Sequence, residues 1–111
     1  MVNGREHLGE FEIIVLLAVV RLGDDAYGVP VRREIEKRTK RQVTVGALYR
    51  TLDRLEEKEY VSSWFSEPVA ERGGRSKRYF RVGKLGIKAL EQSAREWNAM
   101  WSGVELKCRR S

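Results

Sequence analysis

The stretch that decides the fold is TVGALYRTLDRLEEK, residues 44–58. Its leucines recur at four- and three-residue steps, which predicts a helix with one buried stripe. These leucines are Leu48, Leu52 and Leu55. Thr44 precedes the run and is expected to cap the helix. Because the first turn is expected to expose only small residues, Gly46 and Ala47, this end of the helix can closely approach a phosphate backbone or a major groove.

Two short segments rich in β-forming residues follow, YVSSWF at 60–65 and KRYFRV at 77–82. The residues between them include Pro68, which ends the first strand, and Gly73-Gly74, which permits a sharp turn. Helix, strand, basic loop and strand in this order is the plan of a winged helix-turn-helix. We therefore expect a mainly α (α+β) fold, built from a winged helix-turn-helix and a long C-terminal dimerisation helix.

The 111 residues suit one domain around one core, and 22 Lys+Arg against 16 Asp+Glu give a net charge of +6. The cations concentrate on both sides of the central helix, at 32–41 and at 72–88, and the second cluster contains no acid. A basic field beside a helix of groove-sized width indicates a polyanionic partner. The alternative for either cluster is an ordinary solvated surface.

The residue inventory argues against most catalytic chemistry. Cys108 is the only cysteine and His7 the only histidine, so one chain cannot assemble an intrachain disulfide, a histidine-based zinc site or a catalytic triad. We expect neither enzymatic activity nor a cofactor. The apolar run at 13–20 is far shorter than the ~20 residues of a membrane helix, and it lacks a secretory cleavage pattern. The expected compartment is the reducing cytoplasm, without a membrane partner.

Two further helices are expected ahead of the central one. The segment 9–22 is apolar nearly all round, and a helix of this kind needs burial on more than one side. It is expected to contact both its own core and a second chain, although its own domain could also wrap it completely. One face is formed by Phe11, Ile14, Val15, Ala18 and Leu22, and the remainder is largely covered by Ile13, Leu16, Leu17 and Val20. The segment 27–39 forms the second helix, with Pro30 in its first turn, and Val43 could add a minimal strand.

The segment from Lys84 to about Leu106 is expected to form the last helix. Its apolar residues follow the three- and four-residue steps of a coiled-coil seam: Ile87, Leu90, Ala94, Trp97, Trp101 and Val104. Left in water, this stripe would be a large apolar patch, so pairing with a second copy is expected; packing back onto the first helix is the alternative. The chain thus divides into a DNA-binding domain, 1–83, and a dimerisation helix with a basic tail, 84–111. The expected interface comprises Phe11, Leu17, Leu90, Ala94, Trp97, Trp101 and Val104.

The central helix and the wing resemble those of the PadR-like transcriptional regulators. The helix pattern of that family is roughly G-x-L-Y-x-x-L-x-R-L-E, and the wing pattern G-x-x-[RK]-[RK]-Y-Y/F is similar to GGRSKRYF at 73–80. The matching helix residues are Gly46, Leu48, Tyr49, Leu52, Arg54, Leu55 and Glu56. Where the family often has L-H-G-Y-E-I and L-T-x-x-G, this chain keeps only Gly28 and Gly86. The resemblance covers residues 8 to 105.

This resemblance implies a homodimeric repressor that binds a pseudo-palindromic operator in double-stranded DNA. The chain is similar to the compact branch of the family, in which one C-terminal helix dimerises with help from the first helix. Some members of the family respond to small aromatic or cationic compounds bound between the subunits. A protein-docking or RNA-binding winged helix without operator specificity is the alternative function. That alternative would favour a wing poor in basic residues, which this chain lacks.

In such a dimer the two central helices would enter successive major grooves ~34 Å apart. The residues expected at the groove are Thr44, Gly46, Ala47, Tyr49 and Arg50, together with Arg54, which could instead pair with Asp53 or Glu57. The residues expected to contact phosphate or the minor groove from the wing are Arg72, Arg75, Ser76, Lys77 and Arg78. Tyr49 could instead be structural and close the helix against the wing. Trp97 and Trp101 could frame a cavity for a flat aromatic ligand, with plain interface packing as the alternative.

Overall fold

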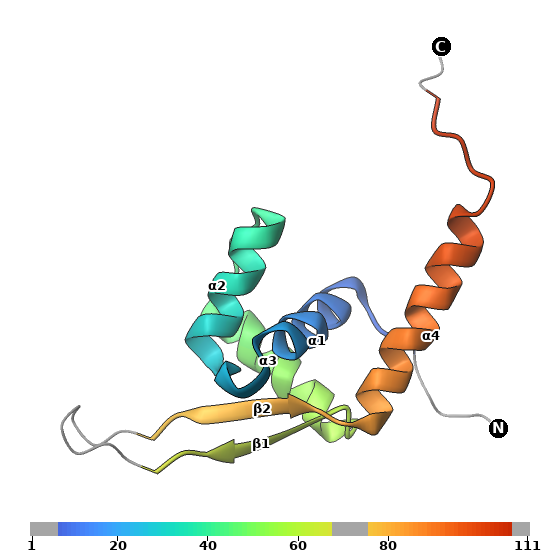
Figure 1. Ribbon diagram of the computed structural model, residues 1–111. Coiled ribbons are helices and arrows are strands. Elements are labelled where there is room, and N and C mark those ends of the chain that lie inside the picture. Colours follow the sequence, from blue (N-terminus) through green and yellow to red (C-terminus); the bar gives the residue numbers. More distant parts are fainter. Residues whose placement is uncertain (1–6, 68–75, 108–111) are drawn as a thin grey trace.

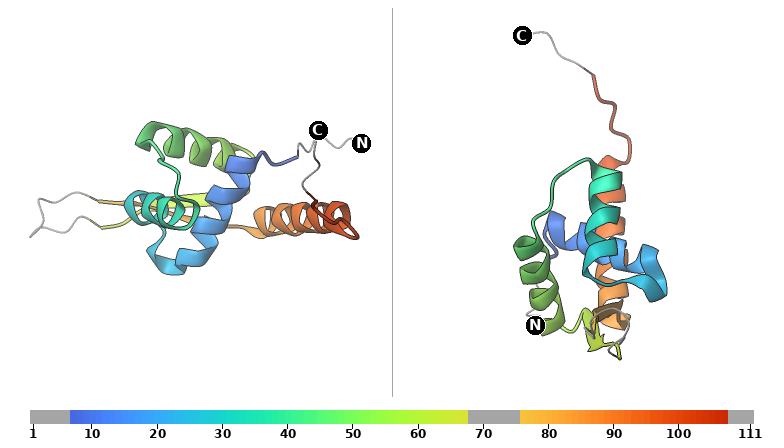
Figure 2. Two further views of the ribbon diagram at one scale, coloured as in Figure 1. Left: turned by 90° about the horizontal axis from the view of Figure 1, so that it is seen from above. Right: turned by 90° about the vertical axis from the view of Figure 1, so that its left-hand side faces the viewer.

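The computed structural model describes residues 7–67 and 76–107. Along this part of the chain the elements are α1 (Glu10–Leu22), a short 3₁₀ turn η1 (Gly23–Asp25), α2 (Gly28–Thr39), α3 (Val45–Glu57), β1 (Val61–Phe65), β2 (Arg78–Val82) and α4 (Lys84–Trp101). Figure 1 shows α1, α2 and α3 gathered beside the β1–β2 hairpin, while α4 leaves the end of β2 and projects away. The left view in Figure 2 shows the same separation of α4 from the body.

The helix starts follow from local chemistry. The side chain of Thr44 accepts a hydrogen bond from the Ala47 N–H (3.1 Å), which confirms it as the cap of α3. Glu12 plays a comparable part at α1, where its Oε1 accepts from the Gly9 N–H (2.8 Å). Pro30 lies in the first turn of α2, as expected, because no intrahelical donor is needed there.

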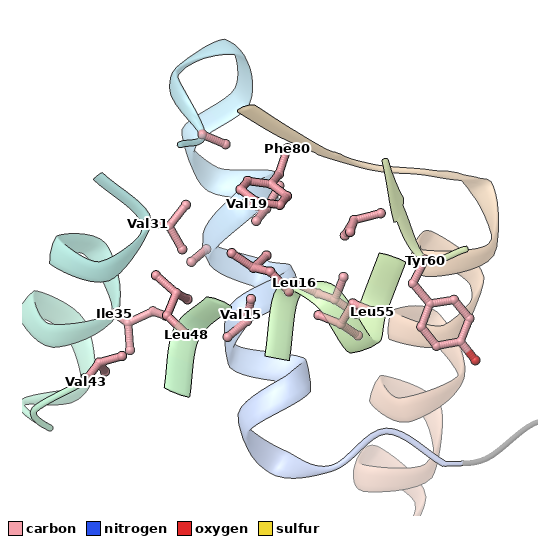
Figure 3. Close-up of a cluster of buried hydrophobic side chains, with 14 residues drawn as sticks. Val15, Leu16, Val19, Val31, Ile35, Val43, Leu48, Leu55, Tyr60 and Phe80 are labelled. Atoms are coloured by element: carbon pink, nitrogen blue, oxygen red, sulfur yellow. The ribbon is translucent and has the colours of Figure 1, made fainter. Parts of the chain in front are cut away.

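The core lies between α1, α2, α3 and the hairpin, and Figure 3 shows its side chains converging. The expected leucine stripe of α3 is confirmed, since Leu48, Leu52 and Leu55 are at most 1% exposed. Phe80 of β2 fills the same core and is also 1% exposed. Each side chain of this size contributes roughly 1.5–3 kcal/mol by leaving water, so the stripe fixes which face of α3 remains outside.

The core face of α1 differs from the expected one. The buried residues are Glu12, Val15, Leu16, Ala18 and Val19, whereas Phe11, Ile14 and Leu22 are only partly buried. This difference in the buried face has a physical cause. Because α1 contacts α2, α3, β2 and α4, its buried residues lie on several sides of the helix. Leu17 and Val20 are each 45% exposed and form an apolar ridge on the outer side. The helix is therefore not wrapped completely by its own domain.

The hairpin is antiparallel and pairs Val61 with Val82 through to Phe65 with Arg78. Beyond the strands, the Ser66 N–H donates to the Lys77 carbonyl (2.8 Å). On its other edge β2 forms an isolated bridge between Tyr27 and Tyr79. The minimal strand expected at Val43 is absent from this described stretch, because α2 side chains satisfy its backbone: its N–H donates to Glu36 (2.8 Å) and its carbonyl accepts from Arg32 (2.8 Å).

The last helix is shorter than expected and ends at Trp101 instead of near Leu106. The chain turns at Gly103, whose φ is +75°, and the Val104 N–H donates to the Trp101 carbonyl (3.0 Å). Val104 therefore does not continue the helical stripe, which corrects its expected place on the seam. In the described residues no helix combines the length and the apolar character that crossing a membrane requires.

Candidate nucleic-acid interface

The outer face of α3 carries most of the residues expected at the groove. Thr44, Gly46, Arg50 and Arg54 are exposed and Ala47 is partly buried, on the side opposite the leucine stripe. Nη1 of Arg50 lies 3.8 Å from the position that a Cβ would take at Gly46. The guanidinium therefore reaches back over the first turn at Gly46, where the unpaired N–H groups of a helix give a partial positive charge. The expectation that this turn exposes only small residues is wrong, since Val45 is 52% exposed. Charge and shape here both suit an anionic backbone.

The turn between α2 and α3 adds a basic groove beside this face. Its volume is about 610 Å³, and Arg32, Lys40, Arg41 and Thr44 contribute to its lining. Arg32 is committed to the fold through its bond to the Val43 carbonyl, whereas Lys40 and Arg41 are exposed, Arg41 pairing with Glu10 across 3.3 Å. Thr44 was expected at the DNA groove, and the basic cluster at 32–41 was the sequence signal for the cations that line this surface.

Part of this basic cluster has a structural task. Glu34 of α2 accepts hydrogen bonds from Arg38 on its own helix and from Arg21 of α1. The hydrogen bond from Arg38, and then the one from Arg21, hold the pKa of Glu34 below its ordinary value. The pair between Arg21 and Glu34 therefore joins α1 to α2, while Arg38 binds the same carboxylate from within α2. The cations of the cluster are thus divided between structural pairs and the exposed groove.

The wing contributes exposed cations from the hairpin. Ser76 and Lys77 are exposed, and Nζ of Lys77 lies 4.4 Å from the centre of the Tyr27 ring and 3.3 Å from its hydroxyl. Lys77 is thereby held against Tyr27 just beyond the outer end of the paired strands, with its charge still accessible. Arg72 and Arg75, two of the expected wing contacts, lie outside the described residues.

An aromatic row on the outer face of the hairpin contacts the same Tyr27 ring. Tyr79 stacks on Trp64, with ring centres 6.0 Å apart and planes 17° apart, and also contacts Tyr27 at 5.2 Å. Arg81 lies over the Trp64 ring at 5.3 Å. Offset ring pairs and cations above rings stabilise the arrangement beyond simple burial. This row has no signal in the sequence, since its members are distant along the chain and meet only through the hairpin register and the bridge between Tyr27 and Tyr79.

Arg78, also expected to contact DNA, is instead bonded within the chain. Its Nη1 pairs with Asp53 (3.1 Å) and its Nη2 with Glu56 (2.6 Å), both on α3. Its Nε donates to the hydroxyl of Ser63 on β1 (3.2 Å). The guanidinium joins the wing to the helix, and its three nitrogens are already used as donors. This arrangement differs from the expected contact with phosphate.

The position of Tyr49 agrees with the structural alternative raised for it. Its side chain is partly buried against the core, with its ring 6.3 Å from that of Phe80 in β2. Its hydroxyl points to Gly28 at the start of α2. The ring thus closes α3 against both the hairpin and α2, on the side turned away from the exposed arginines.

A second surface lies between α1 and α4. An apolar groove of about 350 Å³ brings together four residues of the expected interface, namely Leu17, Leu90, Ala94 and Trp97. Trp97 is 56% exposed and Trp101, one turn further along α4, is 51% exposed. Phe11 does not line this groove, because it packs partly buried against the core. Among the residues that the structure describes, no cluster of histidine, cysteine, aspartate and glutamate could hold a metal ion.

Comparisons with known proteins agree with this geometry. The model of the transcriptional regulator PadR-like family matches residues 16–92. An uncharacterized protein of Lysinibacillus sphaericus is 32% identical over 100 residues, which cover 88% of this chain and 87% of that protein. The structure of a transcriptional regulator from Clostridium thermocellum is similar to this chain, with a TM-score of 0.67 and 27% sequence identity. The aligned region covers 81% of this chain and 84% of that chain. F93 from STIV, a winged-helix DNA-binding protein, shares the fold with a TM-score of 0.69 at 18% identity, over 90% of this chain and 100% of its own.

Proposed function

The chain belongs to the PadR-like family of transcriptional regulators, and we propose that it is a homodimeric repressor that binds a pseudo-palindromic operator in double-stranded DNA. Membership makes it a DNA-binding regulator and not an enzyme. The observation that carries the proposal is the outer face of α3, where Arg50 lies over a glycine-containing first turn between the groove of the α2–α3 turn and the wing. A surface of this width and charge fits a major groove and the phosphates on either side of it.

The contacts divide into base reading and phosphate binding. In the proposal Arg50 reads base edges, while Gly46 and Ala47 allow the helix end to come close; Thr44 approaches the backbone beside Lys40 and Arg41. Arg54 lies further along α3 at the edge of this surface. The wing contributes Ser76 and Lys77, and Arg72 and Arg75 stay predicted phosphate contacts. Arg78 and Tyr49 are omitted because their side chains are bonded or packed within the domain.

The proposed dimer is formed along α4 with help from α1. The exposed ridge at Leu17 on α1 and the groove beside Trp97 on α4 give each subunit an apolar surface. Figure 1 shows that α4 itself projects from the body. Monomeric proteins rarely leave such continuous apolar surface in water, and a second copy offers the same surface in return. In the proposed two-fold arrangement the two α3 helices enter successive major grooves ~34 Å apart.

The same groove is the proposed place for a small aromatic effector. Its lining is mostly apolar, and Trp97 presents a flat indole face of the kind that stacks on planar compounds. Titration of a panel of planar aromatic compounds, followed by tryptophan emission, tests this part. Saturable quenching would identify an effector, whereas no saturable quenching across the panel would assign Trp97 and Trp101 to packing alone.

The test of DNA binding starts with selection of bound fragments from genomic DNA, which yields the operator. Loss of a base contact in Arg50→Ala is expected to reduce affinity for the operator by about 5- to 150-fold, with little effect on random duplex. Lys77→Ala is expected to weaken binding to the operator and to random duplex alike. It should also reduce the slope of log affinity against log salt concentration by about one unit. Lys107→Ala, which removes an exposed lysine beyond α4, is the matched control. If the unaltered protein selects no fragment and ignores duplex at low salt, the proposal fails.

A further inference from the structure

Arg78 is the centre of a polar connection between the wing and α3. Besides its pairs with Asp53 and Glu56, its Nε donates to Ser63, and the Ser63 hydroxyl in turn donates to the Glu56 carboxylate (2.9 and 3.0 Å). The guanidinium also lies 4.9 Å from the centre of the Phe80 ring. Three elements, α3, β1 and β2, therefore meet at one side chain that is only 24% exposed.

Arg78 lies at the outer end of the paired strands of the hairpin. It is the first residue of β2 and pairs with Phe65, the last residue of β1, so it ties the outer end of the paired strands to α3. Closer to the body, Phe80 is fixed by the core and by its N–H bond to the Ala26 carbonyl (2.8 Å). Without Arg78 the outer end would keep its pairing with β1 but lose its polar attachment to α3.

The two carboxylates that pair with Arg78 both belong to α3. Asp53 and Glu56 lie on the side of α3 that faces the wing, with 59% and 36% of their side chains exposed. In the proposed complex the phosphate backbone passes between α3 in the groove and the wing beside it. Two uncompensated carboxylates there would repel phosphate, and Arg78 compensates them at hydrogen-bonding distance.

We propose that Arg78 is a positioning residue for DNA binding, which fixes the wing to α3 and neutralises Asp53 and Glu56, and that it is not itself a phosphate contact. This inference rests on the proposed function, since it concerns how the DNA-binding surface is held. Arg78→Ala is expected to lower operator affinity on the order of tenfold, the usual scale for loss of a coupled network. Binding is measured at a temperature where a melting curve shows every variant folded.

A cycle of variants separates positioning from direct contact. The neutral pair Asp53→Asn/Glu56→Gln is made both in the unaltered chain and in Arg78→Ala. If Arg78 neutralises the carboxylates, the pair raises operator affinity more in Arg78→Ala, where the acids are uncompensated. If Arg78 contacts phosphate, the acids compete for it, and the pair raises affinity more in the unaltered chain. The second result would overturn the inference.

A measurement without DNA tests the fixing of the wing to α3 separately from the proposed function. Hydrogen exchange of the segment 61–67, read by mass spectrometry, reports on the pairing of the hairpin up to Ser66. Faster exchange is expected in Arg78→Ala and an intermediate rate in Arg78→Lys, which keeps the charge but loses the forked geometry. Unchanged exchange in Arg78→Ala would overturn the fixing of the wing even if DNA binds normally. Failure of the unaltered protein to bind duplex would overturn the proposed function and the DNA part of this inference, while exchange still decides whether Arg78 fixes the wing.

Discussion

The hydroxyl of Tyr49 lies so close to Gly28 that a Cβ at Gly28 would stand 2.1 Å from this oxygen and 2.9 Å from the ring carbon Cζ. The ring is also held against Phe80, so it has little room to withdraw. Gly28→Ala is therefore expected to lower the free energy of unfolding by about 1–3 kcal/mol through overpacking. Urea unfolding followed by far-UV circular dichroism measures this change.

A second variant, Tyr49→Phe, tests whether the contact between Tyr49 and Gly28 is the cause of this loss of stability. Tyr49→Phe removes the atom at 2.1 Å, so Gly28→Ala is expected to cost less in a Tyr49→Phe background than in the unaltered chain. Equal costs in the two backgrounds would show that the contact between Tyr49 and Gly28 is not what excludes a side chain.

Gly86 marks a second close approach, between α4 and the hairpin. A Cβ there would stand 2.4 Å from the Tyr60 carbonyl oxygen, a backbone atom that already accepts a hydrogen bond from the Gly83 N–H (2.9 Å). Gly86→Ala is expected to displace α4 and to lower thermal stability, at a cost of roughly 1–3 kcal/mol. Gly83→Ala is the matched control, because its nearest neighbour lies at 4.0 Å. Similar melting temperatures for the two variants would contradict this expectation.

The elements that the sequence predicts well are those with a single periodic signal. The leucines of α3 leave only one face to bury, and Thr44 is a residue type whose side chain caps helices, so both the helix and its start are correct. The core face of α1 could not be assigned in the same way. A helix apolar nearly all round has no single preferred face, and only its neighbours decide that Leu16 is buried while Leu17 is not.

The candidate site likewise contains residues whose place the sequence predicts and residues whose place it does not. The exposure of Gly46 and Arg50 follows from their position opposite the leucines, which spacing alone predicts. The roles of Arg78 and Tyr49 depend on contacts across the fold: Arg78 meets partners 22 and 25 residues earlier in the chain. A list of basic residues does not distinguish a cation paired within the protein from one left to bind phosphate. The packing of β2 against α3, which brings Arg78 to Asp53 and Glu56, makes that distinction.

The pair between Glu12 and Lys58 links α1 to the end of α3. Glu12 is 8% exposed, and its Oε2 lies 3.0 Å from Nζ of Lys58. Lys58→Met leaves this carboxylate buried without the ammonium group, so the free energy of unfolding is expected to fall by about 1–3 kcal/mol. Chemical unfolding measures the loss. Glu12→Gln/Lys58→Met should recover part of it, and a double variant no more stable than Lys58→Met would contradict the role of the pair.

Glu34 gives a pH-dependent contribution to stability. The hydrogen bond from Arg38, and then that from Arg21, hold the pKa of Glu34 below its ordinary value. A carboxyl group with a depressed pKa in the folded state stabilises the fold above its unfolded pKa, and this contribution disappears as the pH falls through the folded pKa. Arg38→Ala should raise the Glu34 pKa toward its ordinary value, as measured by NMR titration of the side-chain carboxyl carbon. An unchanged midpoint would contradict the assignment to Arg38.

Substitution of Trp97 tests the proposed dimer interface. Trp97 is 56% exposed and lines the groove with Leu17, so a charge there would be buried in the proposed interface without a designed partner. Trp97→Asp is expected to weaken self-association by about 30-fold or more, which corresponds to a 2 kcal/mol hot spot, as measured by sedimentation equilibrium. Val29→Asp is the matched control, because Val29 is a similarly exposed apolar residue (52%) on α2. Since the operator is expected to require two copies of α3, Trp97→Asp should also bind the full operator little better than a half-site. Sedimentation of Trp97→Asp indistinguishable from that of Val29→Asp would show that the dimer, if formed, does not use this groove.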